Sequence, residues 1–222
     1  MNLFKIWVNH NKKDSFVNQL RRKRFATQQQ VIESLLQKKD HIKILDIGGE
    51  IGFWKHVGWE NKNCTIYLLN LASVPQPEPT PGFIQITGNA LSLPFNEGEF
   101  DLIFSNSVIE HVGSYENQML FAKEAMRVCD KYIIQTPSLW FPLEPHSLIP
   151  FFQFIPHAFR AIFIMYFNIN YFPKQNNYKD ALTTSRSTIM FTKKRFKSIF
   201  PEATIQVEKL FGIPKSYTAI KI

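Results

Sequence analysis

The stretch Ile44–Trp54, which reads ILDIGGEIGFW, decides the fold of this 222-residue chain. An apolar run leads into Asp46 and stops at the pair Gly48 and Gly49, as a buried parallel strand does where it turns into a helix. Glycine lets the backbone turn tightly there and lets a ligand approach more closely than a Cβ atom would permit. The stretch therefore predicts a nucleotide-type binding turn between a strand and a helix.

Strand-like apolar runs and helical segments alternate on both sides of this turn. We expect strands at residues 42–47, 64–69, 83–87, 100–105, 131–135, 203–210 and 216–222, and helices at residues 14–39, 50–58, 115–128 and 192–200. Such alternation is typical of a parallel sheet covered by helices on both faces. The length suits one domain with a substantial core, so we expect residues 1–222 to form a single domain, with Asp14 capping its first helix.

Two segments break the alternation. The prolines of residues 75–81 stand on alternate positions, in a loop that can be neither a helix nor an interior strand. Residues 137–184 combine several prolines with many aromatic residues, which indicates an insertion after the fifth strand. Within it, residues 151–172 are apolar but are interrupted by polar and charged side chains. A membrane-spanning helix is not expected there, which leaves a lid or core helix or a shallow membrane contact.

The formal net charge of +8 is placed unevenly along the chain. Residues 1–40 form a basic N-terminal helical region, in which the run Arg21–Arg24 covers most of a helix circumference. This run is either a solvated helix face or an attraction for an anionic partner, such as a phosphate-bearing substrate, an acidic membrane surface or nucleic acid. Cys64 and Cys129 show neither a disulfide nor a zinc pattern, and residues 1–5 lack the apolar core of a signal peptide. We therefore expect a cytoplasmic protein.

Two further motifs follow the glycine turn. The segment Gly88–Phe95, GNALSLPF, comes after the expected third strand, and Glu99–Val112, EFDLIFSNSVIEHV, spans the fourth strand and the turn after it. With these motifs in this order, the chain resembles the class I S-adenosylmethionine-dependent methyltransferases, in particular the methyltransferase type 11 group. The first motif of that family is Asp-x-Gly-x-Gly-x-Gly, and Glu50 here stands in place of the middle glycine.

The resemblance implies a Rossmann-like α/β fold, built as a three-layer sandwich. Its mostly parallel seven-stranded sheet would have the last strand antiparallel between the fifth and the sixth, and residues 137–184 would form an acceptor-side insertion or lid. The cofactor would be S-adenosylmethionine, with S-adenosylhomocysteine as its product. No metal is expected, because Asn106 and Ser107 supply no second carboxylate beside Glu110.

The resemblance also implies cofactor-binding residues near the ends of the first four strands, where ligands of open α/β sheets bind. These residues are Asp46, Gly48, Gly49, Glu50, Gly52, Asn70, Leu71, Asn89, Ala90, Ser105 and Asn106. Asp46 would hold the turn and reach the ammonium group of the cofactor through water, or it would simply cap the next helix. Glu50 would either fill the pocket or offer a carboxylate to that ammonium group.

Asn70 and Asn89 stand where this family generally has acids. Asn70 would contact the ribose with one acceptor oxygen and a donor amide, or it serves only the turn. Asn89 would accept a hydrogen bond from the adenine amino group through its carbonyl oxygen. The two replacements together favour a coherent adaptation of the cofactor site.

Three polar residues are candidates for the catalytic chemistry. His111 is the first candidate for a general base, because the ordinary pKa of histidine, near 6.5, suits proton transfer at neutral pH; the alternative is a histidine that stabilises the turn. Glu144 and His146 stand between prolines in an apolar stretch of the insertion, where they would contact or deprotonate the acceptor or serve the structure alone.

The resemblance therefore implies an enzyme that transfers a methyl group from S-adenosylmethionine to a small-molecule, glycan or lipid-intermediate acceptor. A peripheral contact with the membrane surface is a further hypothesis, which the basic N-terminal region and residues 151–172 suggest. One alternative is a catalytically inactive binding or scaffold protein, as Glu50 and Asn70 would suggest. Another is a nucleic-acid methyltransferase, although no Asn-Pro-Pro-Tyr type signature is present, so nucleic acid is not the expected partner.

Overall fold

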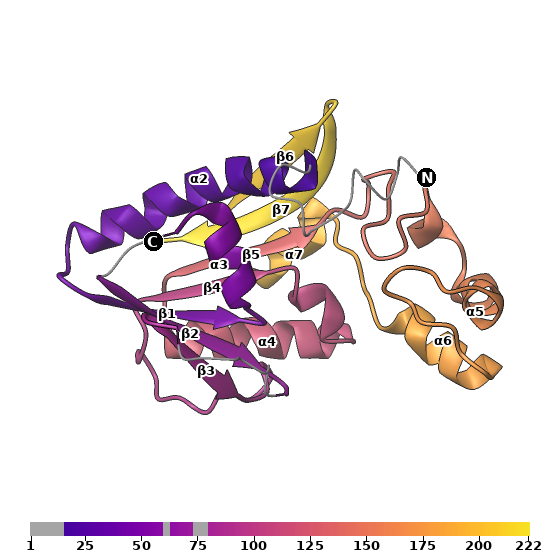
Figure 1. Ribbon diagram of the computed structural model, residues 1–222, viewed down its shortest axis with the longest axis horizontal. Helices are drawn as coiled ribbons and strands as arrows, with labels where there is room; N and C mark the ends of the chain where they lie inside the picture. Colours follow the sequence, from indigo (N-terminus) through magenta and orange to yellow (C-terminus); the bar gives the residue numbers. More distant parts are fainter. Residues whose placement is uncertain (1–15, 60–62, 73–79) are drawn as a thin grey trace. The chain divides into compact units, whose positions relative to one another are not determined.

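The computed structural model describes residues 16–59, 63–72 and 80–222 (Figure 1). The predicted helix cap Asp14 and the predicted loop prolines at positions 75, 77 and 79 lie outside these residues. The helices and strands are α2 (Phe16–Leu36), β1 (Ile42–Ile47), α3 (Ile51–Val57), β2 (Cys64–Asn70), β3 (Phe83–Thr87), β4 (Leu102–Asn106), η1 (Ile109–His111), α4 (Tyr115–Val128), β5 (Tyr132–Pro137), η2 (Phe152–Phe154), α5 (His157–Tyr166), α6 (Tyr178–Arg186), α7 (Lys193–Ile199), β6 (Thr204–Leu210) and β7 (Ile213–Lys221).

The strands form a seven-stranded sheet in the order β3-β2-β1-β4-β5-β7-β6. β1 pairs in parallel with both β2 and β4, and β2 pairs in parallel with β3. β7 lies between β5 and β6 and runs antiparallel to β6. The predicted fold class is thereby confirmed, including the position of the last strand. Strand order reverses at β1, so the carboxyl ends of β1 and its neighbours are the edge at which open α/β sheets bind ligands.

The end of the sheet formed by β6 and β7 differs from its prediction chiefly in where β7 begins. β7 begins at Ile213 instead of at residue 216, since only Phe211 and Gly212 separate the two strands. Both turn residues have positive φ angles, 51° and 79°, which is the backbone of a two-residue hairpin turn. The glycine in this turn was the signal for a hairpin that the strand prediction did not use.

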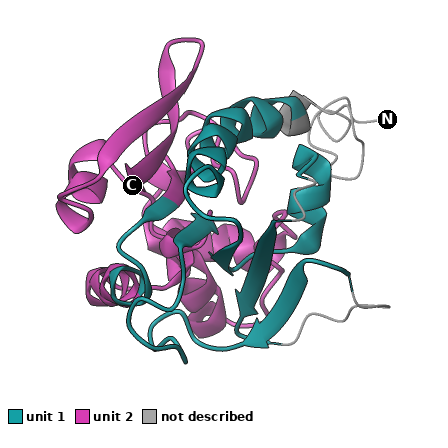
Figure 2. Ribbon diagram, turned by 90° about the vertical axis from the view of Figure 1, so that its left-hand side faces the viewer, with its two compact units in different colours: residues 1–105, 125–133, 222 teal, residues 106–124, 134–221 magenta. Residues whose placement is uncertain are grey.

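Two compact units make up the chain: unit 1, residues 1–105, 125–133 and 222, and unit 2, residues 106–124 and 134–221 (Figure 2). In unit 1, the buried side chains of α2 recur every three or four residues, at Phe25, Gln28, Ile32 and Leu35. The ring of Phe25 packs edge to face against Phe53, Trp54, Trp59 and Phe104. This aromatic cluster fixes α2 and α3 on the strands of unit 1.

Unit 2 contains the predicted insertion, which folds into η2, α5 and α6 with the loops between them. α5 and α6 share a buried core with the residues that flank them. Its buried members are Phe152, Ala161, Ile164, Ile169, Phe172 and Ala181. Among the described residues, no helix is both long enough and apolar enough to cross a bilayer.

Candidate functional site

The glycine turn after β1 depends on two glycines for different reasons. Gly48 has a φ angle of 73°, in the left-handed region that favours glycine, and its N–H donates to the carbonyl of Leu69 at 2.7 Å. Gly49 is buried above the side chain of Asp46. A Cβ atom on Gly49 would lie 2.0 Å from Asp46 Oδ2 and 2.8 Å from Asp46 Cβ, so no side chain fits there. The prediction of a tight turn that needs glycine thus has a steric cause.

Gly52 lies in the first turn of α3, where its surroundings are open. A Cβ atom on Gly52 would meet nothing within 4 Å, in contrast to one on Gly49. The backbone of this first helical turn is therefore open to a ligand, which can approach it as closely as the missing side chain allows.

Asp46 connects β1 to α3. Its carboxylate is buried and accepts a hydrogen bond of 2.7 Å from the indole Nε1 of Trp54. Burial raises the pKa of the Asp46 carboxyl from 3.8 to about 8; the bond from Trp54 opposes this shift, and the charge of Glu50 adds to it. At neutral pH a large fraction of Asp46 therefore keeps its proton. Its predicted contact with the cofactor stays a prediction.

This raised pKa makes stability depend on pH. Between about pH 4 and pH 8 folded Asp46 holds a proton that the unfolded chain releases, so Asp46 lowers the free energy of unfolding as pH rises through this window. We expect Asp46→Asn, which keeps an acceptor for Trp54, to lose this dependence. Melting temperatures of both proteins from pH 5 to pH 8 test the expectation, and parallel curves would contradict it. Comparison with the variant is needed because His111 has the opposite effect on stability. Its folded pKa is lowered, so it lowers the free energy of unfolding as pH falls below 6.5.

Glu50 and Asn70 both adjoin the turn. Glu50 is the exposed residue that precedes α3, and its side chain caps no amide of that helix. The amide Nδ2 of Asn70, at the end of β2, donates to the carbonyl of Gly49 at 2.9 Å. This bond ties the end of β2 to the glycine turn and leaves Asn70 Oδ1 as the acceptor for a ligand hydroxyl. An aspartate, which has no N–H, could not make the same tie, which is a physical reason for asparagine here.

The remaining predicted cofactor residues serve varied local roles. Asn89 Oδ1 accepts from the N–H of Leu91 at 2.9 Å, so one of its two lone pairs already holds the loop after β3. Ser105 is buried, and its hydroxyl donates to the carbonyl of Ile47, which binds β4 to β1. The other three, Leu71, Ala90 and Asn106, are exposed or half-buried. None of these positions excludes a ligand contact, and their predicted roles stay predictions.

Arg127 was not among the predicted residues, although it shapes the loop of the third motif. Its guanidinium donates to the carbonyls of Phe95 at 2.8 Å and Leu93 at 3.1 Å. The arginine lies at the end of α4, more than 30 residues from the loop that it holds. The sequence shows Arg127 only as a basic residue near the C-terminus of a predicted helix. Such residues are common, so the sequence does not indicate which carbonyl groups Arg127 binds.

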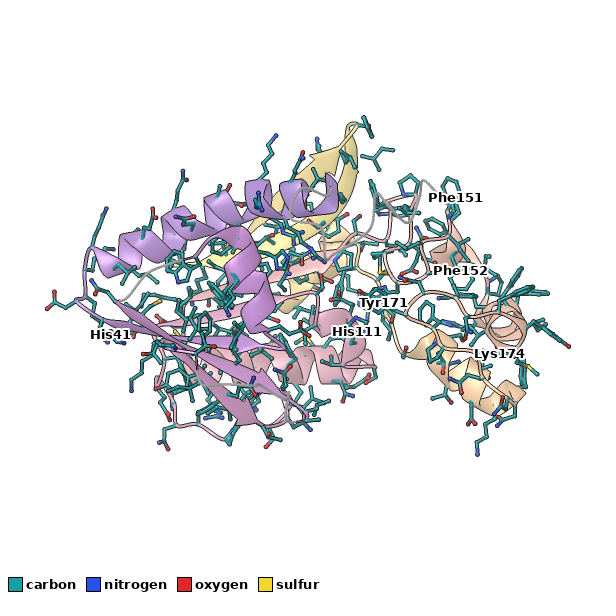
Figure 3. The ribbon with its side chains drawn as sticks, in the orientation of Figure 1. His41, His111, Phe151, Phe152, Tyr171 and Lys174 are labelled. Carbon is teal, nitrogen blue, oxygen red and sulfur yellow. The ribbon has the colours of Figure 1, made fainter. Side chains whose placement is uncertain are left out.

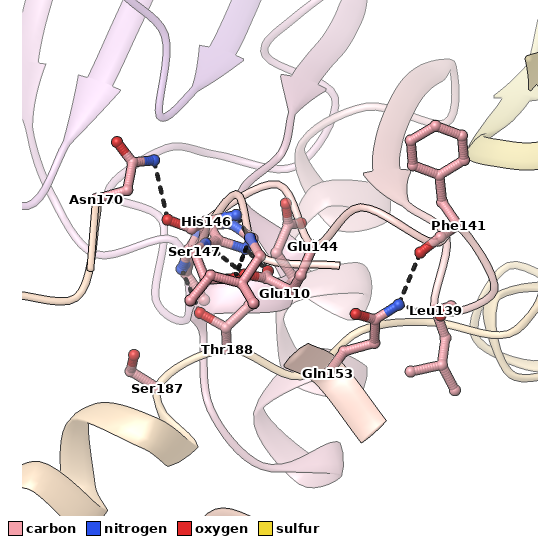
Figure 4. Close-up of polar contacts among 12 residues, drawn as sticks. Glu110, Leu139, Phe141, Glu144, His146, Ser147, Gln153, Asn170, Ser187 and Thr188 are labelled. Atoms are coloured by element: carbon pink, nitrogen blue, oxygen red, sulfur yellow. Dashed lines mark hydrogen bonds and ion pairs between the residues drawn. The ribbon is translucent and has the colours of Figure 1, made fainter. Parts of the chain in front are cut away.

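The three predicted catalytic residues form one hydrogen-bonded chain within unit 2. Figure 4 shows Glu144 and His146 of this chain. Glu144 Oε1 lies 2.6 Å from His146 Nδ1, and His146 Nε2 lies 3.1 Å from His111 Nε2. The backbone N–H groups of His146 and Ser147 also donate to the Glu144 carboxylate. His111 Nδ1 lies 3.5 Å from the hydroxyl of Thr188. The structure therefore brings Glu144, His146 and His111 together.

These contacts assign the protons along the chain. A carboxylate only accepts, so Nδ1 of His146 carries a proton, and in the neutral form of this ring Nε2 is the acceptor. His111 must then donate through Nε2, which leaves its Nδ1 lone pair facing the hydroxyl of Thr188. The arrangement is that of a carboxylate that orients one imidazole, which in turn orients a second.

The environment sets the charge of each member. Partial desolvation of the ring and repulsion from His146 lower the pKa of His111 from 6.5 to about 4, while the charge of Glu144 partly offsets them. Burial raises the pKa of the Glu144 carboxyl, but the bond and charge of His146 and the bonds from Ser147 outweigh it, so this pKa lies below its ordinary value. Near neutral pH, Glu144 is thus a carboxylate and His111 a neutral imidazole with an acceptor nitrogen.

Glu110 adds a carboxylate next to the two histidines. It is fully buried, and its Oε2 accepts from the hydroxyl of Thr136 at 3.0 Å. One ligand atom from each of Glu110, His111 and His146 lies within 4.8 Å of the others, a set that could hold a divalent metal ion. Glu110 belongs to the fourth motif, but the sequence did not indicate that an insertion histidine would join it. Metal independence stays a prediction.

Comparisons with known proteins bear on these features. Residues 62–132 match the family model of the methyltransferase type 11 group, described as a methyltransferase domain. Among curated proteins the sequence has no significant match.

Three of the similar solved structures come from Methanosarcina mazei, Haemonchus contortus and Galdieria sulphuraria. A protein from Methanosarcina mazei, described as a SAM-dependent methyltransferase, is 14% identical, with a TM-score of 0.48, and 82% of this chain covers 92% of that one. Phosphoethanolamine N-methyltransferase 2 of Haemonchus contortus, in complex with S-adenosyl-L-methionine, is 15% identical, with a TM-score of 0.48. The match covers 78% of this chain and 35% of that one. A Galdieria sulphuraria protein, described as a candidate sarcosine dimethylglycine methyltransferase, is 18% identical, with a TM-score of 0.37. The match covers 50% of this chain and 45% of that one.

The chain thus spans less than half of the Galdieria and Haemonchus proteins. The match of residues 62–132 covers β2, β3, β4 and α4 and includes the third and fourth motifs. The resemblance read from the sequence is thereby confirmed over these residues, which are similar to the methyltransferase domain of the type 11 group.

Proposed function

We propose that the chain transfers a methyl group from S-adenosylmethionine to a small molecule, a glycan or a lipid-linked intermediate. The observation that carries the proposal is the hydrogen-bonded chain Glu144–His146–His111 in a protein whose residues 62–132 match a methyltransferase domain. When bound, S-adenosylmethionine supplies a methyl group already activated by the sulfonium. The protein then has to align the acceptor and take its proton.

Unit 1 would hold the cofactor around the glycine turn. Its backbone can be approached by a ligand there, because Gly52 leaves the first turn of α3 open. The carboxylate of Glu50 would attract the ammonium group, and Asn70 Oδ1 would accept from a ribose hydroxyl. Glu50 is exposed, which favours a ligand contact over a side chain that fills the pocket.

Unit 2 would supply the base. His111 would take a proton from the acceptor at Nδ1, with the weak bond from Thr188 giving way. Because burial and repulsion from His146 lower the pKa of His111 to about 4, it is a weak base, and proton transfer is favoured when its Nε2 proton passes toward His146. Glu144 would stabilise the positive charge that develops on His146. Glu144 is thus a positioning residue, whereas His111 acts on the acceptor.

A methyl-transfer assay tests the proposal. The purified protein is incubated with methyl-labelled S-adenosylmethionine and a cell extract that has been separated into aqueous small molecules, glycans, lipids and nucleic acids. We expect label in one of the first three fractions and none in the nucleic acids. Incorporation into nucleic acid alone would contradict the proposed acceptor class. Cofactor binding without transfer to any fraction would favour the scaffold alternative.

Removal of metal ions tests the chemistry of the two histidines. Since His111 and His146 bond each other, we expect dialysis against a chelator to leave the transfer rate unchanged. Rates before and after dialysis, and after a single divalent cation is added back, provide the measurement. A loss of activity that one cation restores would instead make Glu110, His111 and His146 metal ligands.

A further inference from the structure

Helix α5 of unit 2 exposes a row of large apolar side chains. Phe159, Ile162, Phe163 and Tyr166 are between 45% and 68% exposed, and Phe167, directly after the helix, is 59% exposed. We define these five residues as the aromatic face. Figure 3 shows side chains that extend outward from α5.

The positions of the aromatic face follow one side of the helix. Residues 159, 162, 163 and 166 are spaced by three, one and three, and they fall within about 100° of the helix circumference. The opposite side, which carries Arg160, Ala161 and Ile164, is buried. Both sides of the helix therefore carry apolar residues, and among the described residues only the buried side packs against other parts of the chain.

The buried side shows that α5 is firmly docked. Ala161 and Ile164 belong to the core shared with α6, and the Arg160 Nε donates to the carbonyl of Ile155 at 2.9 Å. The backbone N–H of Gln175 also donates to the carbonyl of Ile164 at 3.1 Å. The exposure of the aromatic face is thus a property of the folded unit, since turning the helix inward would break these contacts.

Basic residues outnumber acidic ones in the part of unit 2 that contains α5. The backbone of Lys174 is held near the end of α5, where its N–H donates to Asn168 Oδ1 at 3.0 Å. Lys174, Lys179 and Arg186 are exposed, whereas Asp180 is the one acidic residue between positions 145 and 192. Exposed aromatic rings with nearby bases and few acids are suited to the interface of a membrane that contains anionic lipids.

We propose that the aromatic face of α5 docks on the surface of an anionic membrane, with its rings at the level of the lipid headgroups. With 10 residues the helix is about 15 Å long, which suits a helix lying in the interface and not one crossing the bilayer. The same face on a second copy is a less favourable occupant, because two chains of formal net charge +8 repel each other. This docking goes beyond methyl transfer and does not depend on it.

Vesicle co-sedimentation tests the docking surface. The full chain is mixed with vesicles of phosphatidylcholine alone or of phosphatidylcholine with one-third phosphatidylglycerol. The variant Phe159→Glu with Phe163→Glu places two acids on the aromatic face. The control is Phe211→Glu, which changes an equally large exposed aromatic residue in the turn between β6 and β7. Thermal melting checks that each variant is folded.

We expect the wild type to bind the anionic vesicles more tightly than the neutral ones. The double variant should bind at least about tenfold more weakly, and Phe211→Glu should bind as the wild type does. No binding to anionic vesicles, or equal binding by the double variant, would overturn the proposal. A second result would also overturn the proposal: the wild type does not bind vesicles and is a dimer in sedimentation equilibrium, whereas the double variant is a monomer. The aromatic face would then join two copies of the chain.

Discussion

Gly49→Ala is expected to destabilise the protein by at least about 3 kcal/mol, which corresponds to a melting temperature roughly 10 °C lower. The new methyl group would lie 2.0 Å from Asp46 Oδ2, 2.2 Å from its Cγ and 2.8 Å from its Cβ. The end of a flexible side chain could move aside, but Asp46 is buried and bonded to Trp54, and its Cβ is fixed to the strand. Either β1 or the turn must shift, and α3 follows from that turn.

Gly52→Ala is the matched control for this prediction. A Cβ atom there meets nothing within 4 Å, and alanine favours the helix more than glycine does. We expect its melting temperature to be equal to or higher than that of the wild type. Chemical denaturation of the three proteins provides the free energies of unfolding. Equal free energies of unfolding for Gly49→Ala and Gly52→Ala would contradict the close packing of Asp46 against Gly49.

His111→Ala is expected to have the largest effect on the reaction. If His111 is the base, its loss should lower the methyl-transfer rate by roughly 10²–10⁴-fold, with little change in cofactor affinity. His157→Gln is the control, because His157 is a half-buried histidine of the same unit that bonds the carbonyl of Ser185 and has no place in the chain of Glu144, His146 and His111. Single-turnover rates with saturating acceptor provide the comparison. Equal rates for both variants would leave His111 with a structural role.

Glu144→Gln separates positioning from simple structural support. The charge of Glu144 raises the pKa of His111, so its removal should lower that pKa and move the acidic limb of the pH–rate profile to lower pH. The maximal rate should also fall, because His146 loses the carboxylate that stabilises its positive charge. A lower rate with an unchanged pH profile would indicate that Glu144 only supports the loop.

Much of the fold could be predicted because it rests on local patterns. The run Ile42–Ile47 has the apolar character of a strand buried in a sheet, and the structure gives it the predicted bounds. β3 and α4 also have the predicted bounds, whereas β4 begins at Leu102 instead of at residue 100. There, the Asp101 carboxylate accepts from the backbone N–H of Lys43 at 2.7 Å. A bond of this kind, from a side chain to the backbone of a neighbouring strand, leaves no periodic pattern in the sequence from which the strand boundary could be predicted.

The contacts that shape the candidate sites could not be predicted, because they join distant parts of the chain. Asp46 was expected at the turn, but its indole partner was not, since Trp54 read only as part of an apolar helix. His111 and His146 were each proposed separately. They are 35 positions apart, and nothing in the sequence between them indicates that their rings meet. Thr188 is 77 residues from His111. Residue type suggested the candidates, whereas only the tertiary structure shows their partners.

The same limit applies to the insertion. Its prolines and aromatic residues predicted a break in the strand and helix alternation, and the segment folds into two helices around their own core. Which rings are buried depends on the packing of α5 against α6. Phe152 and Phe172 lie inside, whereas Phe159 and Phe163 lie outside, although all four have the same side chain.

Calorimetric titration with S-adenosylmethionine tests the central claim, that unit 1 binds this cofactor at the glycine turn. The proteins to compare are the wild type and Gly52→Leu, which places a large side chain at a position where a Cβ atom meets nothing within 4 Å. We expect the wild type to bind both S-adenosylmethionine and S-adenosylhomocysteine, and Gly52→Leu to bind at least about tenfold more weakly at an unchanged melting temperature. No heat of binding and no thermal stabilisation of the wild type by either ligand would contradict the account.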